Sequence, residues 1–383
     1  MIRLKKAVIY LVEFLRQGKT IGIIGGGQLG QMLALAAKEM GFKTLILDPD
    51  ATCPAGQVAD QQLVFAYDDR LALERLATEA DVLTYEFENV DLAALEELTD
   101  PKLLPQGTEL LKITKNRLAE KTFLKEHGLK TAPFAKVTNK AELAQALKVI
   151  GMPSILKTCE GGYDGKAQQN ILTPADILLA EELLTQGTCI LEGFVDFKLE
   201  CSVMVARNAA GEITVFPVSE NIHRDHILHE SIVPARISES LTDKAQALAK
   251  QIAQGLELKG ILGVEMFIGQ DEEIYINELA PRPHNSGHYS IEACNFSQFD
   301  IHDRAILNWP LPQIELLKPA VMVNVLGQHH AKSQELIQAK PNWHFHDYGK
   351  QEVRTGRKMG HITILTDDLT KTLAEIAETT VWD

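Results

Sequence analysis

The most informative hydrophobic pattern of the chain predicts a hairpin. Two apolar runs, Ile261–Ile268 and Ile274–Leu279, flank a short polar stretch. Apolar runs of this length around a polar turn predict two strands joined at that turn. Each predicted strand carries one acidic residue at an otherwise apolar position, Glu265 on the first and Glu278 on the second.

These two acidic residues are candidate metal ligands. A buried carboxylate is unfavourable unless it is paired or binds a metal, and two on neighbouring strands would repel each other. Magnesium takes hard oxygen ligands and shares them with substrate phosphates, so Glu265 and Glu278 predict a magnesium site. The alternative is a hairpin with one salt-bridged glutamate and a capping loop. After Glu278, Arg282 and His284 follow between and beside prolines, and they predict a place for a second anion.

A glycine-rich turn lies near the start of the chain. Strand Thr20–Ile24 runs into Gly25–Gly30, followed by a predicted helix, Gln31–Met40, and a second strand, Thr44–Leu47, that ends at Asp48. A G-x-G-x-x-G turn in such a unit is typical of dinucleotide binding. The glycines and the helix N-terminus favour any anion, so a nucleoside monophosphate fits this pattern as well as NAD does.

Acidic residues follow the next strand of this unit. The predicted strand Asp81–Tyr85 ends at Glu86 and Glu88. Ligands of open α/β sheets bind at the carboxyl ends of strands, so these side chains could hold ribose hydroxyls. Solvated loop acids are the alternative.

A strand lysine before a glycine-rich loop predicts a phosphate-binding lid. Lys157 ends the apolar strand that begins at Pro153, and the loop 160–166 contains three glycines. Their N–H groups can hold phosphates, and the loop can close over a triphosphate. The alternative is a hairpin tip with incidental lysines. Further on, Glu192 and Glu200 flank a segment that suits an adenine edge and ribose hydroxyls.

The C-terminal part carries the densest positive patch. Four cations, Lys350, Arg354, Arg357 and Lys358, fall within nine residues. In a chain with 38 Lys and Arg against 52 Asp and Glu, and a net charge of −14, such a patch predicts a local anion site.

Composition excludes several classes of protein. A hydrophobic content of 45% and a charged content of 23% are typical of soluble globular proteins. The acidic balance and the lack of a basic run argue against nucleic-acid binding. Five scattered cysteines without C-x-x-C spacing indicate a reducing compartment, with neither a disulfide framework nor a zinc site. No apolar stretch of membrane-spanning length occurs, and Glu13 and Arg16 interrupt the signal-like start, so we expect a cytoplasmic protein.

Six segments together resemble the N5-carboxyaminoimidazole ribonucleotide synthetases, a family of ATP-grasp enzymes. They occur in family order from residue 20 to about residue 365: GGGQLGQM, TYEFEN, TKNRLAEKTFL, ILKTCEGGYDGKAQ, INELAPRPHNSGH and EVRTGRKMGH. GGYDGK combined with ELAPRPHNSGH is specific, since formate-using relatives on this fold typically have a serine-rich loop. The resemblance implies an α/β (α+β overall) ATP-grasp fold. Its implied parts are an extension at 1–18, a Rossmann-like pre-ATP-grasp domain at 19–115, a lid domain at 116–196, a catalytic ATP-grasp domain at 197–320 and a small β-rich subdomain at 321–383.

The resemblance also implies an activity. Members of the family combine ATP, bicarbonate and 5-aminoimidazole ribonucleotide to give N5-carboxyaminoimidazole ribonucleotide, ADP and phosphate in de novo purine (IMP) biosynthesis, with carboxyphosphate as the proposed intermediate. The implied cofactors are ATP and Mg²⁺, with Mn²⁺ as a substitute. The implied assembly is a homodimer with no nucleic-acid or membrane partner.

By position, the resemblance implies four sets of site residues. The nucleotide contacts are Arg117, Lys157, Gly162, Tyr163, Asp164, Gly165, Lys166, Ala167, Gln168, Glu192, Gly193, Phe194, Val195, Glu200, His223, Asn277 and Glu278. The ribonucleotide contacts are Gln28, Leu29, Glu86, Lys350, Arg357 and Lys358. The catalytic residues, at the ribonucleotide and bicarbonate sites, are Tyr163, Asp164, Lys166, Arg282 and His284. The metal ligands are Glu265 and Glu278.

Two positions depart from related patterns. Ala167 stands where the lid commonly has glycine, and Ala280 stands where many other ATP-grasp enzymes have a third metal ligand. Water or phosphate oxygens would then complete the magnesium shell.

Three rival functions remain open from the sequence. They are an NAD-dependent dehydrogenase that uses the glycine turn and Asp48, a non-catalytic nucleotide sensor of the same fold, and an ATP-grasp ligase with another acceptor.

Overall fold

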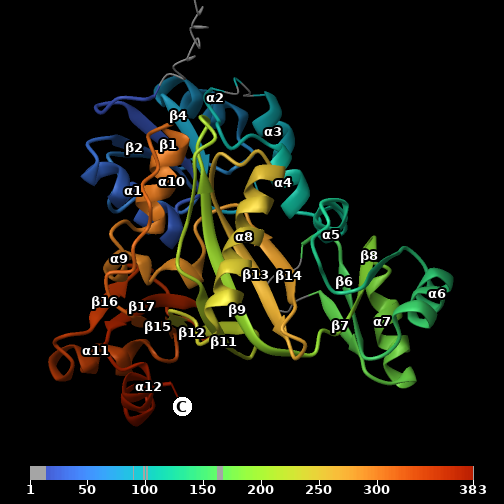
Figure 1. Ribbon diagram of the computed structural model, residues 1–383. Helices are drawn as coiled ribbons and strands as arrows, with labels where there is room; N and C mark the ends of the chain where they lie inside the picture. The colour runs from blue at the N-terminus through green and yellow to red at the C-terminus, as the bar shows by residue number, and fades with distance from the viewer. Residues whose placement is uncertain (1–13, 89, 98–99, 101, 162–166, 383) are drawn as a thin grey trace, which may run out of the picture.

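The computed structural model describes residues 14–88, 90–97, 100, 102–161 and 167–382 of the 383-residue chain. These residues form three β-sheets: one near the N-terminus, one in the green part of the ribbon and a large central one (Figure 1). The predicted lid residues 162–166 lie outside the described residues.

The N-terminal sheet is parallel and has the order β3-β2-β1-β4. Its elements are β1 (Thr20–Ile24), α1 (Gln28–Glu39), β2 (Lys43–Leu47), β3 (Gln61–Leu63), α2 (Arg70–Glu79), β4 (Val82–Tyr85), α3 (Leu92–Glu97) and α4 (Glu109–Thr114). The predicted strand–helix–strand unit is confirmed. Helix α1 begins at Gln28 rather than at the predicted Gln31. The reason is that the N–H groups of Gly27 and Gly30 donate to the side chain of Glu86, the residue that follows β4.

The second sheet is antiparallel, with the order β5-β8-β6-β7. It follows α5 (Arg117–Glu126) and contains β5 (Phe134–Val137), α6 (Lys140–Ile150), β6 (Ser154–Thr158), β7 (Gln168–Ile171), η1 (Pro174–Asp176), α7 (Ile177–Leu183) and β8 (Cys189–Gly193). The sequence predicts α6 from the N-capping Asn139, Glu142 three residues later and the closing Gly151, and the structure confirms this helix. Strand β7 was not predicted, because only its last residue is apolar.

The central sheet has the order β14-β13-β9-β11-β12-β15-β17-β16, with β10 paired to β9. Its strands are β9 (Phe197–Arg207), β10 (Ile213–Val215), β11 (Ser219–Arg224), β12 (Ile227–Val233), β13 (Gly260–Gly269), β14 (Ile274–Ala280), β15 (Ala320–Leu326), β16 (His344–Asp347) and β17 (Lys358–Leu365). The predicted hairpin is β13–β14 and is confirmed. The C-terminal strands continue this sheet through the antiparallel pair β12–β15.

Helices cover the central sheet and join it to the N-terminal unit. They are α8 (Glu239–Gly255), η2 (Asn285–Gly287), α9 (Ser290–Ala293), α10 (Gln298–Ile306), α11 (His330–Ala339) and α12 (Leu369–Glu378). Apolar residues of α8, including Ala249 and Ile252, pack on Val203 and Leu262 in the core. Helix α10 contacts both β13 and α1, and it lies beside α1 in Figure 1 although the two are far apart in sequence. No helix in the described ranges is long and apolar enough to cross a membrane.

Candidate active site

The sheets come together around a cleft of about 710 Å³. Its lining comes from α1 and the end of β4, from the second sheet, from the β13–β14 hairpin with the segment after it, and from the start of β17. The structure therefore brings together residues from all of the implied site sets. The predicted residues that line the cleft are Gln28, Leu29, Glu86, Arg117, Lys157, Gln168, Phe194, Glu200, His223, Glu265, Asn277, Glu278, Arg282, His284 and Lys358.

The predicted acidic pair lies directly across the hairpin. Glu265 and Glu278 are register partners in the β13–β14 ladder, so both side chains leave the same face of the sheet. Burial and the facing Glu265 carboxylate raise the pKa of Glu278. The nearest cation is Arg117, whose Nη1 lies 3.8 Å from Glu278 Oε2, too far for a hydrogen bond.

Glu265 differs because it has a close partner. His284 Nε2 lies 2.9 Å from Glu265 Oε1. Burial acts to raise the pKa of Glu265, but the His284 charge and hydrogen bond outweigh it and lower that pKa. Glu265 is thus ionised and hydrogen-bonded to His284, while Glu278 faces the negative charge of Glu265.

The chemistry of this pair fits a magnesium ion. Two carboxylates on one face offer the hard oxygen donors that Mg²⁺ takes, with further positions left for phosphate oxygens and water. Among the described residues, no group of three or more His, Cys, Asp or Glu side chains could hold a metal on its own. A metal here would therefore need ligand oxygens, in line with the alanine at position 280.

A second charged pair lies on the side of the cleft formed by the second sheet. Lys157 Nζ lies 2.8 Å from Glu192 Oε2, and both side chains are largely buried. Burial acts to raise the pKa of Glu192, but the charges of Lys121 and Lys157 lower it. Lys121 itself is buried on α5 and donates to the backbone oxygen of Asn277 at 2.6 Å. The sequence did not identify Lys121, because a lysine on an amphipathic helix is typical of an exposed face.

Aromatic rings form part of the same side of the cleft. Phe197 and Phe267 stack with their centroids 4.5 Å apart and an interplanar angle of 14°. Close by, His223 Nδ1 lies 2.8 Å from Glu200 Oε2. Apolar rings beside a carboxylate–histidine pair suit a base and a ribose. Phe197 and Phe267 were not predicted, since both lie in strands whose apolar residues indicate core positions.

The backbone of Ala167 adopts a conformation that glycine favours. Its φ is 55°, in the left-handed region that favours glycine. Its carbonyl accepts a hydrogen bond from the backbone N–H of Thr158, which holds this conformation next to the predicted lid.

Arg282 and His284 lie in the cleft as predicted, each beside a carboxylate. Arg282 Nη2 lies 3.0 Å from Glu88 Oε1, and Arg282 Nη1 donates to the backbone oxygen of Pro283 at 3.3 Å. His284 contacts Glu265. Glu88, which the sequence suggested as a ribose contact, also lines the cleft. Other cleft residues that the sequence did not assign to the site are Phe87, Ile155, Asn170, His226, Leu228, Asn285 and His288.

The glycine turn at the start of α1 already holds an anion. Gly27 N donates to Glu86 Oε1 at 2.8 Å, and Gly30 N donates to Glu86 Oε2 at 2.9 Å. Asp48 is also engaged, since Gly26 N and the Tyr67 hydroxyl both donate to its Oδ2. The turn thus holds the chain's own carboxylates, where the pattern predicts a phosphate or a dinucleotide.

The cationic segment lies against the N-terminal unit. Gln57 Nε2 donates to the Gly349 backbone oxygen at 2.9 Å. Hydrogen bonds from Thr52 lower the pKa of Asp50, and the charge of Arg357 adds a smaller effect in the same direction. Lys350 Nζ donates to the Lys358 backbone oxygen at 2.7 Å. Burial and the Arg357 charge lower the pKa of Lys350 to about 8.

Some predicted residues do not line the cleft. Gly162, Tyr163, Asp164, Gly165 and Lys166 lie outside the described residues. The described residues away from the cleft wall are Ala167, Glu192, Gly193, Val195, Lys350 and Arg357.

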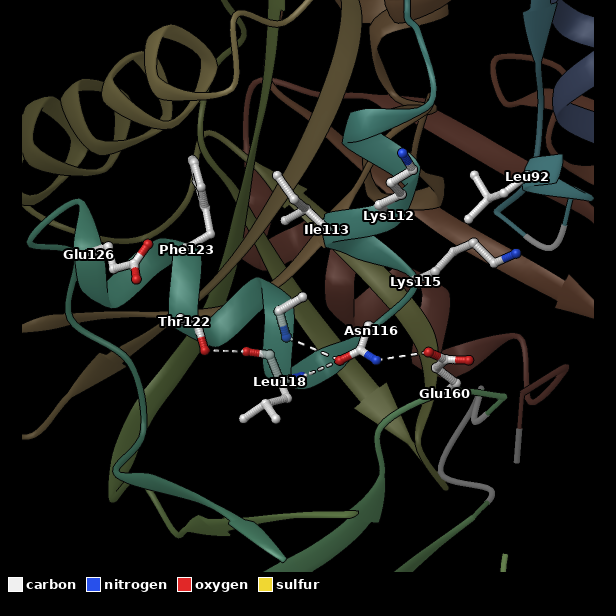
Figure 2. Close-up of a pocket in the computed structure, with 11 residues that line it drawn as sticks. Leu92, Lys112, Ile113, Lys115, Asn116, Leu118, Thr122, Phe123, Glu126 and Glu160 are labelled. Atoms are coloured by element: carbon white, nitrogen blue, oxygen red, sulfur yellow. Dashed lines mark hydrogen bonds between the residues drawn. The ribbon is translucent and has the colours of Figure 1, made fainter. Parts of the chain in front are cut away.

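A second hollow, of about 720 Å³, lies on α4 and α5 (Figure 2). Asn116 caps α5 by accepting from Leu118 N and Ala119 N, and its amide donates to Glu160 Oε1 at 2.8 Å. None of its lining residues belongs to the predicted site sets, and the hollow lies on the outer side of the helix that carries Arg117.

This fold and cleft define an enzyme of the ATP-grasp class. Three family models match the chain in order: the ribonucleotide synthetase preATP-grasp domain at 18–114, the ATP-grasp domain at 122–299 and the phosphoribosylaminoimidazole carboxylase C-terminal domain at 320–375.

Whole-chain relatives narrow the class. The chain is 48% identical over 373 residues to the N5-carboxyaminoimidazole ribonucleotide synthase of Bacillus subtilis, covering 97% of each chain. It is similar to the Staphylococcus aureus synthetase complexed with ADP, with a TM-score of 0.92, 43% identity and coverage of 95% and 98% of the two chains. An Aspergillus clavatus synthase in complex with ADP and 5-aminoimidazole ribonucleotide matches with a TM-score of 0.88, 33% identity and coverage of 94% and 97%. The chain belongs to the N5-carboxyaminoimidazole ribonucleotide synthase family.

Proposed function

We propose that this chain carboxylates 5-aminoimidazole ribonucleotide with bicarbonate at the expense of ATP, giving N5-carboxyaminoimidazole ribonucleotide, ADP and phosphate. The observation that carries the proposal is the acidic pair Glu265 and Glu278, which faces a cleft shared with Lys157, Arg282 and His284. Family membership supports the same reaction, in which the product serves purine biosynthesis.

ATP lies along the side of the cleft formed by the second sheet. Lys157 and Arg117 contact its phosphates, since they are the cations nearest Glu278 on that side. Phe194 and the Phe197–Phe267 stack face the base, and Glu200 with His223 holds the ribose hydroxyls. The lid residues 162–168 close over the phosphates, and residues 192–195 carry the adenine edge.

Magnesium is held by Glu265 and Glu278, with Mn²⁺ as a substitute of the same ligand preference. When bound, the metal neutralises charge on the phosphates during phosphoryl transfer. Glu278 is the ligand that gains most from binding, because it faces the Glu265 carboxylate and its contact with Arg117 is long, at 3.8 Å.

The ribonucleotide lies at the opposite end of the cleft. Gln28, Leu29 and Glu86 contact it from the N-terminal unit, and Lys350, Arg357 and Lys358 receive its 5′-phosphate. Arg282 and His284 lie between the two ends and hold the carboxyl group, with Tyr163, Asp164 and Lys166 completing the catalytic set.

The reaction proceeds in two balanced steps through carboxyphosphate. A bicarbonate oxygen attacks the γ-phosphorus, and the bond to ADP breaks. The exocyclic amine then attacks the carboxyl carbon, phosphate leaves with the bonding electron pair, and the amine loses one proton. Carboxyphosphate is labile in water, so a closed site with matched charge is required.

The test is ADP release, measured with and without bicarbonate and with and without 5-aminoimidazole ribonucleotide. We expect full turnover only when both are present, and one carbamate for each ADP. ADP release that does not depend on bicarbonate would indicate another ATP-grasp ligase. NAD should not raise the melting temperature as ATP does, since Asp48 and the glycine turn are already engaged.

We also propose that the chain is a cytoplasmic homodimer with the domain boundaries predicted above. Its molar mass in solution, measured by light scattering, tests the dimer. Limited proteolysis tests the boundaries, with cuts expected near residues 18, 115, 196 and 320.

A further inference from the structure

A buried glutamine, Gln298, holds the segment after the acidic hairpin. It is the first residue of α10 and has no exposed surface. The backbone N–H of His284 donates to Gln298 Oε1 at 2.9 Å, and Gln298 Nε2 lies 2.8 Å from the backbone oxygen of His284. A backbone N–H can only donate and a backbone oxygen can only accept, so these two contacts fix which end of the amide is oxygen.

The same amide also fixes the proton of a histidine. Gln298 Nε2 lies 2.9 Å from Nδ1 of His288. Since this nitrogen carries two hydrogens and no lone pair to share, it donates to Nδ1, which must then be unprotonated. A neutral His288 ring therefore carries its proton on Nε2.

His288 is held neutral by its surroundings. The ring is 1% exposed, and its centroid lies 4.8 Å from that of His361. Burial, together with the charges of His284, His346, Lys358 and Arg282, lowers the pKa of His288 well below its usual range. All of these effects disfavour a proton on the ring, so the imidazole stays neutral across the range in which enzymes work.

His288 also belongs to the wall of the cleft. His288 lines the cleft together with Arg282, His284 and Lys358. Within the described part of the chain, no group accepts a hydrogen bond from His288 Nε2. The neighbouring Asn285 also lines the cleft, and both of its amide atoms lack a hydrogen-bond partner among the described residues. Buried polar groups without partners are costly and indicate a ligand that supplies them.

We propose that His288 is a neutral hydrogen-bond donor to the carboxyl group under transfer, and that Gln298 is the positioning residue that keeps the donor proton on Nε2. The inference rests on the proposed carboxylation and goes beyond it. An oxygen anion is the ligand indicated, because the cationic side chains Arg282 and Lys358 line the cleft together with His288 and attract negative charge. A neutral donor also suits the product, since protonation of a carbamate nitrogen leads to loss of CO₂. An imidazole that stays neutral can stabilise the oxygen without supplying that proton.

Nitrogen-15 NMR of histidine-labelled protein reads the tautomer without any activity. The His288 signal is assigned by its loss in His288→Gln. We expect an unprotonated Nδ1 and a protonated Nε2 in the parent protein. Gln298→Glu replaces the donating nitrogen with a second carboxylate oxygen, so the proton should move to Nδ1. A protonated Nδ1 in the parent would overturn the inference.

Kinetics test the role of the donor. His288→Leu should raise the bicarbonate KM and lower the yield of carbamate per ADP, with a fall in rate of roughly 10²-fold, the usual effect of losing one preorganised donor. His288→Gln retains an N–H near the same position and should recover part of both. Gln298→Glu should act like His288→Leu, while ATP affinity stays at the parent value in all three.

A matched control is Gln246→Glu, the same change at a partly buried glutamine on α8 that donates to the Phe216 backbone oxygen. It should leave the coupling unchanged. Parent-like bicarbonate KM and coupling in folded His288→Leu would overturn the inference alone. If the parent itself showed no bicarbonate-dependent ADP release, the proposed function would fail, while the NMR result would still decide the tautomer.

Discussion

Two glutamates at opposite ends of the cleft, the buried Glu86 and the more accessible Glu278, have different partners. Burial raises the pKa of both. Each oxygen of Glu86 accepts a backbone N–H from the start of α1. Glu278 instead faces Glu265 across the hairpin and has its nearest cation, Arg117, at 3.8 Å.

This difference indicates that Glu86 has a structural role, whereas Glu278 is available to bind a ligand. Glu86 ties β4 to the glycine turn and leaves that helix N-terminus little free capacity for another anion. Glu278 keeps a repulsion that a divalent cation would relieve. A sequence pattern of acids at strand ends does not distinguish these cases, whereas their hydrogen-bond partners do.

The largest effect is expected from Glu278→Gln. Neutralising a metal ligand should lower the rate of ADP formation by roughly 10²–10³-fold. The ionised form of Glu278 is disfavoured by the fold, so its cost is present above the folded pKa and disappears as pH falls. The melting temperature of the ligand-free variant at neutral pH should therefore equal or exceed that of the parent. Glu273→Gln, at the end of the hairpin turn and paired with Lys244, serves as the control. Activity within threefold of the parent for Glu278→Gln would contradict the metal assignment.

Lys157→Ala tests a third carboxylate, Glu192, whose ionisation depends on neighbouring cations. Removing one partner of a buried pair should lower the free energy of unfolding by about 3 kcal/mol. ATP affinity should fall as well, because the strand offers no replacement cation. Adding Glu192→Gln should restore much of the stability but not the affinity. Calorimetry measures both, with Lys198→Ala on the surface as control, and unchanged ATP binding in Lys157→Ala would mean that the lysine is only structural.

Glu86→Gln should lower the stability of the fold, whereas Glu278→Gln should lower the rate of ADP formation without loss of stability. The amide can accept from one backbone N–H, but its nitrogen then faces the other and leaves a buried donor unsatisfied. The expected loss is about 1–3 kcal/mol in the free energy of unfolding. Urea denaturation measures it against Glu97→Gln, an exposed control. If Glu86→Gln were as stable as the parent, the comparison drawn above would not hold.

The pKa of Lys350, lowered to about 8, predicts a pH dependence for the ribonucleotide. The ammonium is charged below this pKa and neutral above it, so the KM for the ribonucleotide should rise between about pH 7 and about pH 9 while the KM for ATP does not. Lys350→Arg keeps its charge over this range and should remove the rise. A rise that persists in Lys350→Arg would assign the titration to another group.

The smallest effect is expected at Ala167. Glycine adopts a φ of 55° without the steric cost that a side chain brings, so Ala167→Gly should relieve strain of about 1 kcal/mol while adding flexibility to the unfolded chain. We expect a small change in melting temperature and faster closure over ATP, measured by stopped-flow fluorescence. Glu272→Gly, at a φ of 61° in the hairpin tip, is the matched control and should leave closure unchanged.

Much of this architecture could be predicted from the sequence, because local signals were strong. The hairpin followed from two apolar runs around a polar turn, and α6 followed from an N-capping asparagine, Asn139, and a terminal glycine, Gly151. The six motifs identified the family. The acidic pair was located, but its direct cross-strand register depends on a pairing that one strand alone cannot specify.

Other features depend on contacts between distant segments. Glu86 accepts a hydrogen bond from Gly30 in the first turn of α1, 56 residues earlier in the chain, and no local pattern predicts such a partner. Lys121 is buried only because β14 packs over α5. The proton position on His288 follows from Gln298, ten residues away, whose amide orientation is fixed by the backbone of His284.

The pairing of β12 with β15 has a consequence for how the chain is made. During synthesis β12 emerges from the ribosome well before β15. Until β15 emerges, the backbone N–H and C=O groups of β12 that pair with β15 have no strand partner. An unpaired strand such as Ile227–Val233, rich in isoleucine and valine, is a template for pairing with another chain. Premature termination before Ala320 would therefore leave an aggregation-prone edge exposed, and rapid release of the complete chain would protect against it.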